Sequence, residues 1–180
     1  MVNQGTGRQE DRRMMTGLFR DRESTEGAYR SLRARGYTDD DINVLMSDDT
    51  RDKYYKDSDV VADDTKALEG MGTGGAIGGT LGAIIGGIAA IGTNVVMPGL
   101  GLIVWGPIAA ALAGAGAGGL TGGLVGALVG WGIPEEHAKE YEEGIRKGGT
   151  VLGVTPRSDE DADYFDNEWR KNYRGEYVYR

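Results

Sequence analysis

Three aspartates near the C-terminal end have the spacing with which a calcium loop begins. Asp159, Asp161 and Asp163 alternate with other residues, as do the first ligands of an EF-hand. That loop needs Gly at its sixth position and a bidentate Glu at its twelfth, whereas Tyr164 and Arg170 stand there. We therefore expect no metal site, and weak divalent-cation binding is the remaining alternative.

The glycine-rich segment that begins at Gly70 raises the question of phosphate binding. Its sequence GMGTGG contains G-x-G, but no Gly-Lys-Ser/Thr follows, which excludes a P-loop. A dinucleotide fingerprint also requires a preceding strand and a later acidic residue on a second strand. Neither is expected from the flanking sequence, and the glycines continue far beyond any turn. We expect no nucleotide and no cofactor.

The residue types give little support for nucleophilic catalysis. The chain has no Cys, and His137 is its only His. No Ser or Asp has a spacing that predicts a partner for this imidazole, so we interpret it as a surface residue on a helix. Without a nucleophile–base pair, we expect no enzymatic activity, no catalytic residues and no small-molecule substrate.

Aromatic and arginine side chains are concentrated in residues 157–180. Phe165, Trp169 and Tyr173 are spaced by four, which predicts a short amphipathic helix near residues 160–173. Aromatic residues mixed with Arg are typical of protein interfaces, and we expect these three residues to contact another subunit. Packing within the chain is the alternative. Stacking on single-stranded nucleic acid uses similar residues, but the acidic surroundings argue against it.

The elements that would position such residues flank an unusual middle segment. Residues 70–134 contain no Asp, Glu, Lys, Arg or His, and 22 of these 65 residues are Gly. Many of the glycines recur at every fourth position, which places them on one face of an α-helix. The first ladder is Gly74, Gly78, Gly82 and Gly86, and the second is Gly114, Gly118, Gly122, Gly126 and Gly130.

A glycine face lets another backbone approach closely, so the ladders predict helix–helix packing. We expect a hairpin over residues 65–132, with helices at about 65–92 and 107–131 separated by helix-breaking residues in 92–106. One interpretation is the core of a soluble homo-oligomer. Another is a membrane hairpin, since each helix is long enough to span about 30 Å, although glycine-rich helices insert only marginally. A hairpin packed only on its own domain is the third.

The flanks predict a small α+β domain made of residues 14–64 and 133–156, after a polar N-terminus (1–13). The first elements are a strand at 14–19, a helix at 22–35 and a strand at 42–46. Asp21 caps this helix and Gly36 ends it. Helix 134–147 and strand 150–155 follow the hairpin. This order matches most of a ferredoxin-like, split βαβ domain. Its fourth strand is missing unless residues 54–61 or 176–179 supply it.

Two segments carry a family resemblance. MMTGLFRDRESTEGAYRSLRARGYTDDDINVLMSDD (14–49) and GIPEEHAKEYEEGIRKGGTVLGV (132–154) flank a glycine-rich middle. Together they resemble the bacterial general-stress or heat-induced stress protein family, whose members are often labelled low-temperature-induced. The resemblance implies a stress-linked role and carries over no catalytic residues.

Composition narrows the function classes further. A net charge of −8, all of it in the flanks, gives no broad reason to bind nucleic acid. The N-terminus has no apolar core of the secretory kind, and we expect a cytoplasmic protein. The sequence thus predicts a non-enzymatic stress protein that self-assembles through glycine-zipper helices. Membrane association of the hairpin is the alternative, and a small-molecule-binding regulatory domain is a third class.

Overall fold

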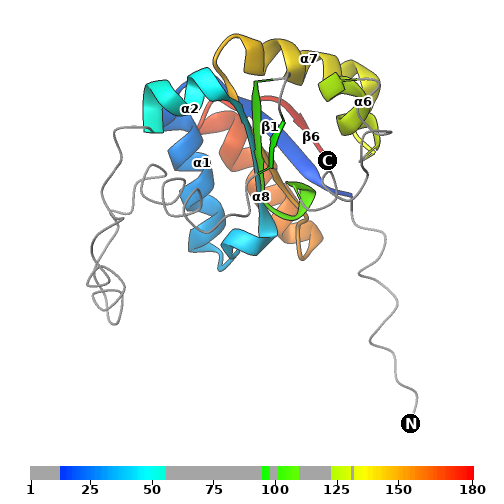
Figure 1. Ribbon diagram of the computed structural model, residues 1–180. Helices are drawn as coiled ribbons and strands as arrows, with labels where there is room; N and C mark the ends of the chain where they lie inside the picture. Colours follow the sequence, from blue (N-terminus) through cyan, green and yellow to red (C-terminus); the bar gives the residue numbers. More distant parts are fainter. Residues whose placement is uncertain (1–12, 56–94, 98–100, 110–122, 131) are drawn as a thin grey trace.

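The computed structural model describes residues 13–55, 95–97, 101–109, 123–130 and 132–180 (Figure 1). These residues form an α+β structure with one layer of strands and with helices on both sides of it. In chain order the elements are β1 (Met15–Phe19), α1 (Arg22–Ala34), the 3-10 turn η1 (Asp39–Asp41), β2 (Ile42–Ser47), α2 (Asp48–Tyr55), β3 (Val95–Met97), β4 (Leu102–Trp105), α6 (Gly123–Gly130), α7 (Glu135–Arg146), β5 (Thr150–Val154), α8 (Asp159–Lys171) and β6 (Glu176–Tyr179).

The strands form one six-stranded sheet in the order β3-β4-β2-β5-β1-β6, and every neighbouring pair is antiparallel. Strand β5 lies between β1 and β2. Val154 pairs with Met15 on one side and with Ile42 on the other. Because β1 and β2 both run antiparallel to β5, they run in the same direction, and α1 connects them.

Helices cover both faces of this sheet, and each face has its own apolar core (Figure 1). On one face, Tyr29 and Leu32 of α1 pack with Phe165 and Trp169 of α8. On the other face, the buried residues of α6 and α7 include Leu124, Leu128, Tyr141 and Ile145. Strands that are buried on both faces are expected to be apolar almost throughout, and the sequences INVLMS of β2 and TVLGV of β5 fit this.

Local signals in the sequence explain where the helices begin and end. The Asp21 carboxylate accepts the Ser24 backbone N–H at 2.8 Å, as expected for the cap of α1. Gly36 follows α1 with a φ of 80°, and the Tyr37 N–H returns to the Leu32 carbonyl. This is a Schellman closure. The helices predicted at 22–35, 134–147 and 160–173 and the strands predicted at 14–19, 42–46 and 150–155 are confirmed within a few residues.

The middle segment departs from the predicted hairpin of two long helices. Residues 92–106 were expected only to break helices, yet they contribute β3 and β4, which extend the sheet beyond β2. In the region predicted as helix 107–131, residues 107–109 are helical and α6 covers 123–130. The prediction of a helix at 65–92 lies outside the described residues.

Residues 157–180 belong to the core. Phe165 and Trp169 are 0% exposed, and Trp169 makes an edge-to-face contact with Phe19 at 5.5 Å between ring centroids. The expectation that these two residues contact another subunit is wrong, because the apolar face of α8 is used against its own sheet. Tyr173 is half-buried, and its ring lies where a Cβ on Gly27 of α1 would be only 2.4 Å away.

Removing the Trp169 indole should therefore destabilise the fold rather than merely separate subunits. We expect Trp169→Ala to lower the free energy of unfolding by about 3–5 kcal/mol, because it leaves a cavity between α8 and the sheet. Urea denaturation measures this, with exposed Lys171→Ala on the same helix as control. An unchanged unfolding free energy together with a reduced native mass would restore the subunit-contact interpretation.

Candidate functional site

The outer face of helix α6 is the described feature most closely tied to the glycine ladders. Leu124 and Leu128 are buried toward the sheet, at 3% and 1% exposure. Val129 is 42% exposed, and only Tyr177 joins it among the exposed large apolar side chains of the described residues. Gly126 and Gly130 are exposed on the same helix, four positions apart. We call Gly126, Val129 and Gly130 the α6 outer face.

This face has room for a close neighbour. A Cβ built at Gly126 or at Gly130 meets nothing within 4 Å among the described residues. The two glycines therefore leave a groove in the helix surface, with an apolar valine beside it. Of the predicted ladder residues, only these two are described; Gly74, Gly78, Gly82, Gly86, Gly114, Gly118 and Gly122 lie outside the described residues.

A Schellman closure fixes the C-terminal end of α6. The Ile133 N–H bonds to the Leu128 carbonyl at 3.2 Å and the Gly132 N–H to the Val129 carbonyl at 2.9 Å. Gly132 has a φ of 84°, which glycine adopts without strain. Ile133 and Leu128 share one apolar cluster with α7 and the sheet. The α6 outer face is thus held at a defined position relative to the sheet.

Asn43 fixes the point at which the chain leaves β4. Its side chain is 4% exposed, and its Oδ1 accepts the Ile108 backbone N–H at 2.9 Å. Its Nδ2 donates to the Gly153 carbonyl of β5 at 3.4 Å. Gly106, with a φ of 101°, comes so close that a Cβ would lie 2.3 Å from the Ile42 carbonyl oxygen. The helical turn at 107–109 therefore starts against β2.

Sequence reasoning missed this role of Asn43. The available signal was an amide side chain inside the otherwise apolar strand INVLM, because a buried amide must find hydrogen-bond partners. The sequence alone could not identify Ile108 as one of those partners, since 65 positions separate the two residues.

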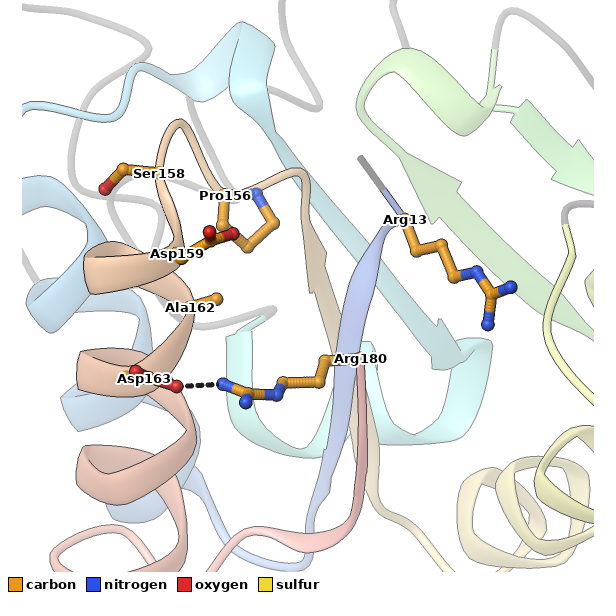
Figure 2. Close-up of a pocket in the computed structure, with 7 residues that line it drawn as sticks. All are labelled: Arg13, Pro156, Ser158, Asp159, Ala162, Asp163 and Arg180. Carbon is orange, nitrogen blue, oxygen red and sulfur yellow. Dashed lines mark hydrogen bonds and ion pairs between the residues drawn. The ribbon is translucent and has the colours of Figure 1, made fainter. Parts of the chain in front are cut away.

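An open pocket of about 410 Å³ lies between the start of α8 and the ends of β1 and β6 (Figure 2). The guanidinium of Arg180 points toward Asp163 and forms an ion pair with it, whereas the side chain of Arg13 points the other way. Two arginines and two aspartates line the pocket, so its charges balance and select no ligand of one sign. The lining residues are Arg13, Pro156, Ser158, Asp159, Ala162, Asp163 and Arg180.

The three aspartates with calcium-loop spacing lie on the first turns of α8. Asp161 accepts hydrogen bonds from the Tyr37 hydroxyl at 2.7 Å and from Arg35 at 2.5 Å, and Asp163 is paired with Arg180. No group of three potential metal-ligating side chains occurs in the part of the chain that the structure describes. The imidazole of His137 lies 5.0 Å from the Tyr179 ring and 4.0 Å from a Glu136 oxygen.

Tyr37, which follows α1, contacts both α8, through Asp161, and the loop before it, through Arg157. The Tyr37 hydroxyl donates to Asp161 and accepts the Arg157 backbone N–H at 2.7 Å. Burial, reinforced by the bond to Asp161, raises the pKa of Tyr37 to about 12. Burial alone would raise the pKa of Asp161, but the bonds from Tyr37 and Arg35 outweigh it and lower that pKa. These hydrogen bonds stabilise the contact between the C-terminal end of α1 and the start of α8.

No protein-family model matches the chain, and neither curated proteins nor solved structures give a match. Within the described ranges, no helix has both the length and the apolar character needed to cross a bilayer.

Asn43 provides the first test of the site. We expect Asn43→Ala to lower the free energy of unfolding by about 1–3 kcal/mol, because the buried Ile108 N–H loses its partner. Chemical denaturation measures the loss, and exposed Asn167→Ala on α8 is the control. A change of less than about 0.5 kcal/mol would show that water replaces the amide.

The lowered pKa of Asp161 predicts that the stability of the fold depends on pH. Because its pKa is lowered in the folded state, the unfolded chain binds the proton first as the pH falls. The stabilisation is therefore complete above the ordinary aspartate pKa and is lost as the pH drops below it. We expect Asp161→Asn to be less stable at pH 7 and to lose less stability between pH 5 and pH 3 than wild type. Asp159→Asn, on the same helix turn, is the control; parallel curves for the two variants contradict the prediction.

Proposed function

We propose that this chain is a non-enzymatic stress-response protein that forms homo-oligomers through its glycine-rich insert. The α6 outer face carries this proposal. It is apolar, rigidly anchored and open among the described residues, and it belongs to a glycine ladder inside a 65-residue segment without charge. A second copy of the same face fits it, because two glycine grooves allow close backbone contact and no charges repel each other.

The scaffold in this proposal is a ferredoxin-like unit that carries the insert. Taken by themselves, β2, β5, β1 and β6 lie in the order expected of a split βαβ sheet. Helices α1 and α8, which follow its first and third strands, pack together in one core cluster. In this view α8 and β6 supply the second half of the unit, and the insert runs from α2 to α7. The stress link rests on the resemblance of residues 14–49 and 132–154 to the general-stress family.

Membrane association of the insert is the second candidate. The observation that favours it is the length of the uncharged run, 65 residues. Acidic residues follow it at once, Glu135 and Glu136, and they disfavour contact with anionic lipids. Native mass without detergent, compared with flotation on neutral and anionic liposomes, separates the two candidates.

The α6 outer face predicts how assembly can be broken. We expect Gly126→Leu/Gly130→Leu to fold normally, because an added Cβ meets none of the described residues. The leucines would fill the groove and shift the native mass toward that of the 19.2 kDa monomer. Light scattering coupled to size exclusion measures this at several concentrations.

The matched control places two leucines at the same spacing elsewhere. Asn167→Leu/Lys171→Leu occupies exposed positions of α8, on the opposite face of the sheet. It should retain the wild-type mass. A monomeric wild type, or an α6 variant with unchanged mass, contradicts the proposal.

A further inference from the structure

Strand β6 forms one edge of the described sheet and pairs only with β1. An edge strand offers unpaired backbone groups to strands of other molecules, and proteins commonly blunt such edges. The pairing of β6 with β1 is irregular: Thr16 pairs with Tyr179 and Leu18 with Glu176, so the register shifts between them. Tyr177 lies at this irregularity with a φ of 48°, in the left-handed region.

Two carbonyls in this strand are occupied by side chains from different helices. The Tyr141 hydroxyl of α7 donates to the Tyr177 carbonyl at 2.7 Å. The Arg170 guanidinium of α8 donates to the Val178 carbonyl. Helices α7 and α8 belong to the two layers on opposite faces of the sheet. Consecutive carbonyls of the edge strand are thus satisfied from both sides without a further strand.

Other contacts hold both donor side chains in position. Tyr141 is 0% exposed, and burial raises its pKa, so its hydroxyl keeps the proton at all ordinary pH values. Because that proton goes to Tyr177, the Thr16 hydroxyl must donate to Tyr141, at 2.7 Å. The Arg170 Nε donates to Asp166 at 3.0 Å, one helical turn away.

Charged and polar contacts secure the ends of the same strand. Arg20 pairs with Glu176 at 2.8 Å, and Arg180 pairs with Asp163. Such charged groups along an edge also oppose pairing with a further strand. The contacts of Tyr141 and Arg170 differ from these because they act on the strand backbone itself.

We propose that Tyr141 and Arg170 form an edge cap that prevents β6 from accepting a strand of a second copy. The cap stands independently of the glycine ladders. Its consequence for assembly, that copies meet on the α6 side and not along the sheet, rests on the proposed function.

The test removes the Tyr141 hydroxyl and shortens the side chain at position 170, so that the guanidinium nitrogen that reaches the Val178 carbonyl is lost. Tyr141→Phe/Arg170→Gln leaves the aromatic ring in the core and frees the Tyr177 and Val178 carbonyls. We expect a native mass that grows with protein concentration beyond that of wild type, and thioflavin T binding that wild type lacks. The single variant Arg170→Gln, at an exposed position, should show the same change to a smaller extent.

The matched control removes similar groups that do not touch β6. The Tyr29 hydroxyl bonds to Asp39, and Arg146 pairs with Glu142 one turn before it, as Arg170 does with Asp166. Tyr29→Phe/Arg146→Gln should keep the wild-type mass and bind no thioflavin T.

The outcomes separate this proposal from the proposed function. Growth is measured relative to wild type, so it is informative whether wild type is a monomer or an oligomer. Adding Gly126→Leu/Gly130→Leu should not suppress the growth, since the growth arises along the edge of β6 and not on the α6 outer face. If Tyr141→Phe/Arg170→Gln folds and neither gains mass nor binds the dye, the cap is refuted. If the double variant does not fold, an unchanged mass of folded Arg170→Gln refutes it equally.

Discussion

Burial of the central strands on both faces is the constraint on which this structure depends. In β5 the side chain of Val151 belongs to one apolar core, and those of Leu152 and Val154 belong to the other. Exposing either face would leave a large apolar surface in water, so two helical layers are required. Distant parts of the chain provide them. The C-terminal helix α8 completes one layer with α1, and α6 and α7, which lie between β4 and β5 in the chain, form the other. Helix α6 is therefore structural as well as a candidate for assembly.

Short-range signals made much of the fold predictable. Asp21 before α1 and Gly36 after it define that helix through hydrogen bonds within a few residues, and Gly132 does the same at the end of α6. The partner of an apolar face is harder to predict. The period-four spacing of Phe165 and Trp169 indicated a helix with one apolar side, but nothing local distinguishes a surface on another subunit from the chain's own sheet. Similarly, Asn43 could be seen to need partners, while Ile108 became one of them only through the fold.

The hairpin of β3 and β4 was missed for a different reason. The runs VVM and LIVW are separated by residues that include Pro98 and Gly99, which is a recognised turn signal. The surrounding sequence is uncharged, and its glycines recur at every fourth position, which favoured the interpretation as helix. Tertiary pairing with β2, through Val44 opposite Trp105, then stabilises short strands that have little intrinsic strength. Of the candidate site, the glycine spacing was visible in the sequence, whereas the openness of the α6 outer face was not.

The register of the sheet bears on how much the length of the chain between β2 and β5 can vary. Met46 of β2 lies opposite Thr150 of β5. The chain between these two residues therefore leaves and re-enters the sheet at paired positions, whose Cα atoms are about 5 Å apart. Lengthening a closed loop adds little entropic cost once its ends are fixed, roughly 0.6 kcal/mol for each doubling. Relatives with apolar segments of quite different length can thus share the same frame, provided that α7 still shields Val151 and Leu18. The length of the glycine-rich segment can therefore change without a change in the register of the sheet.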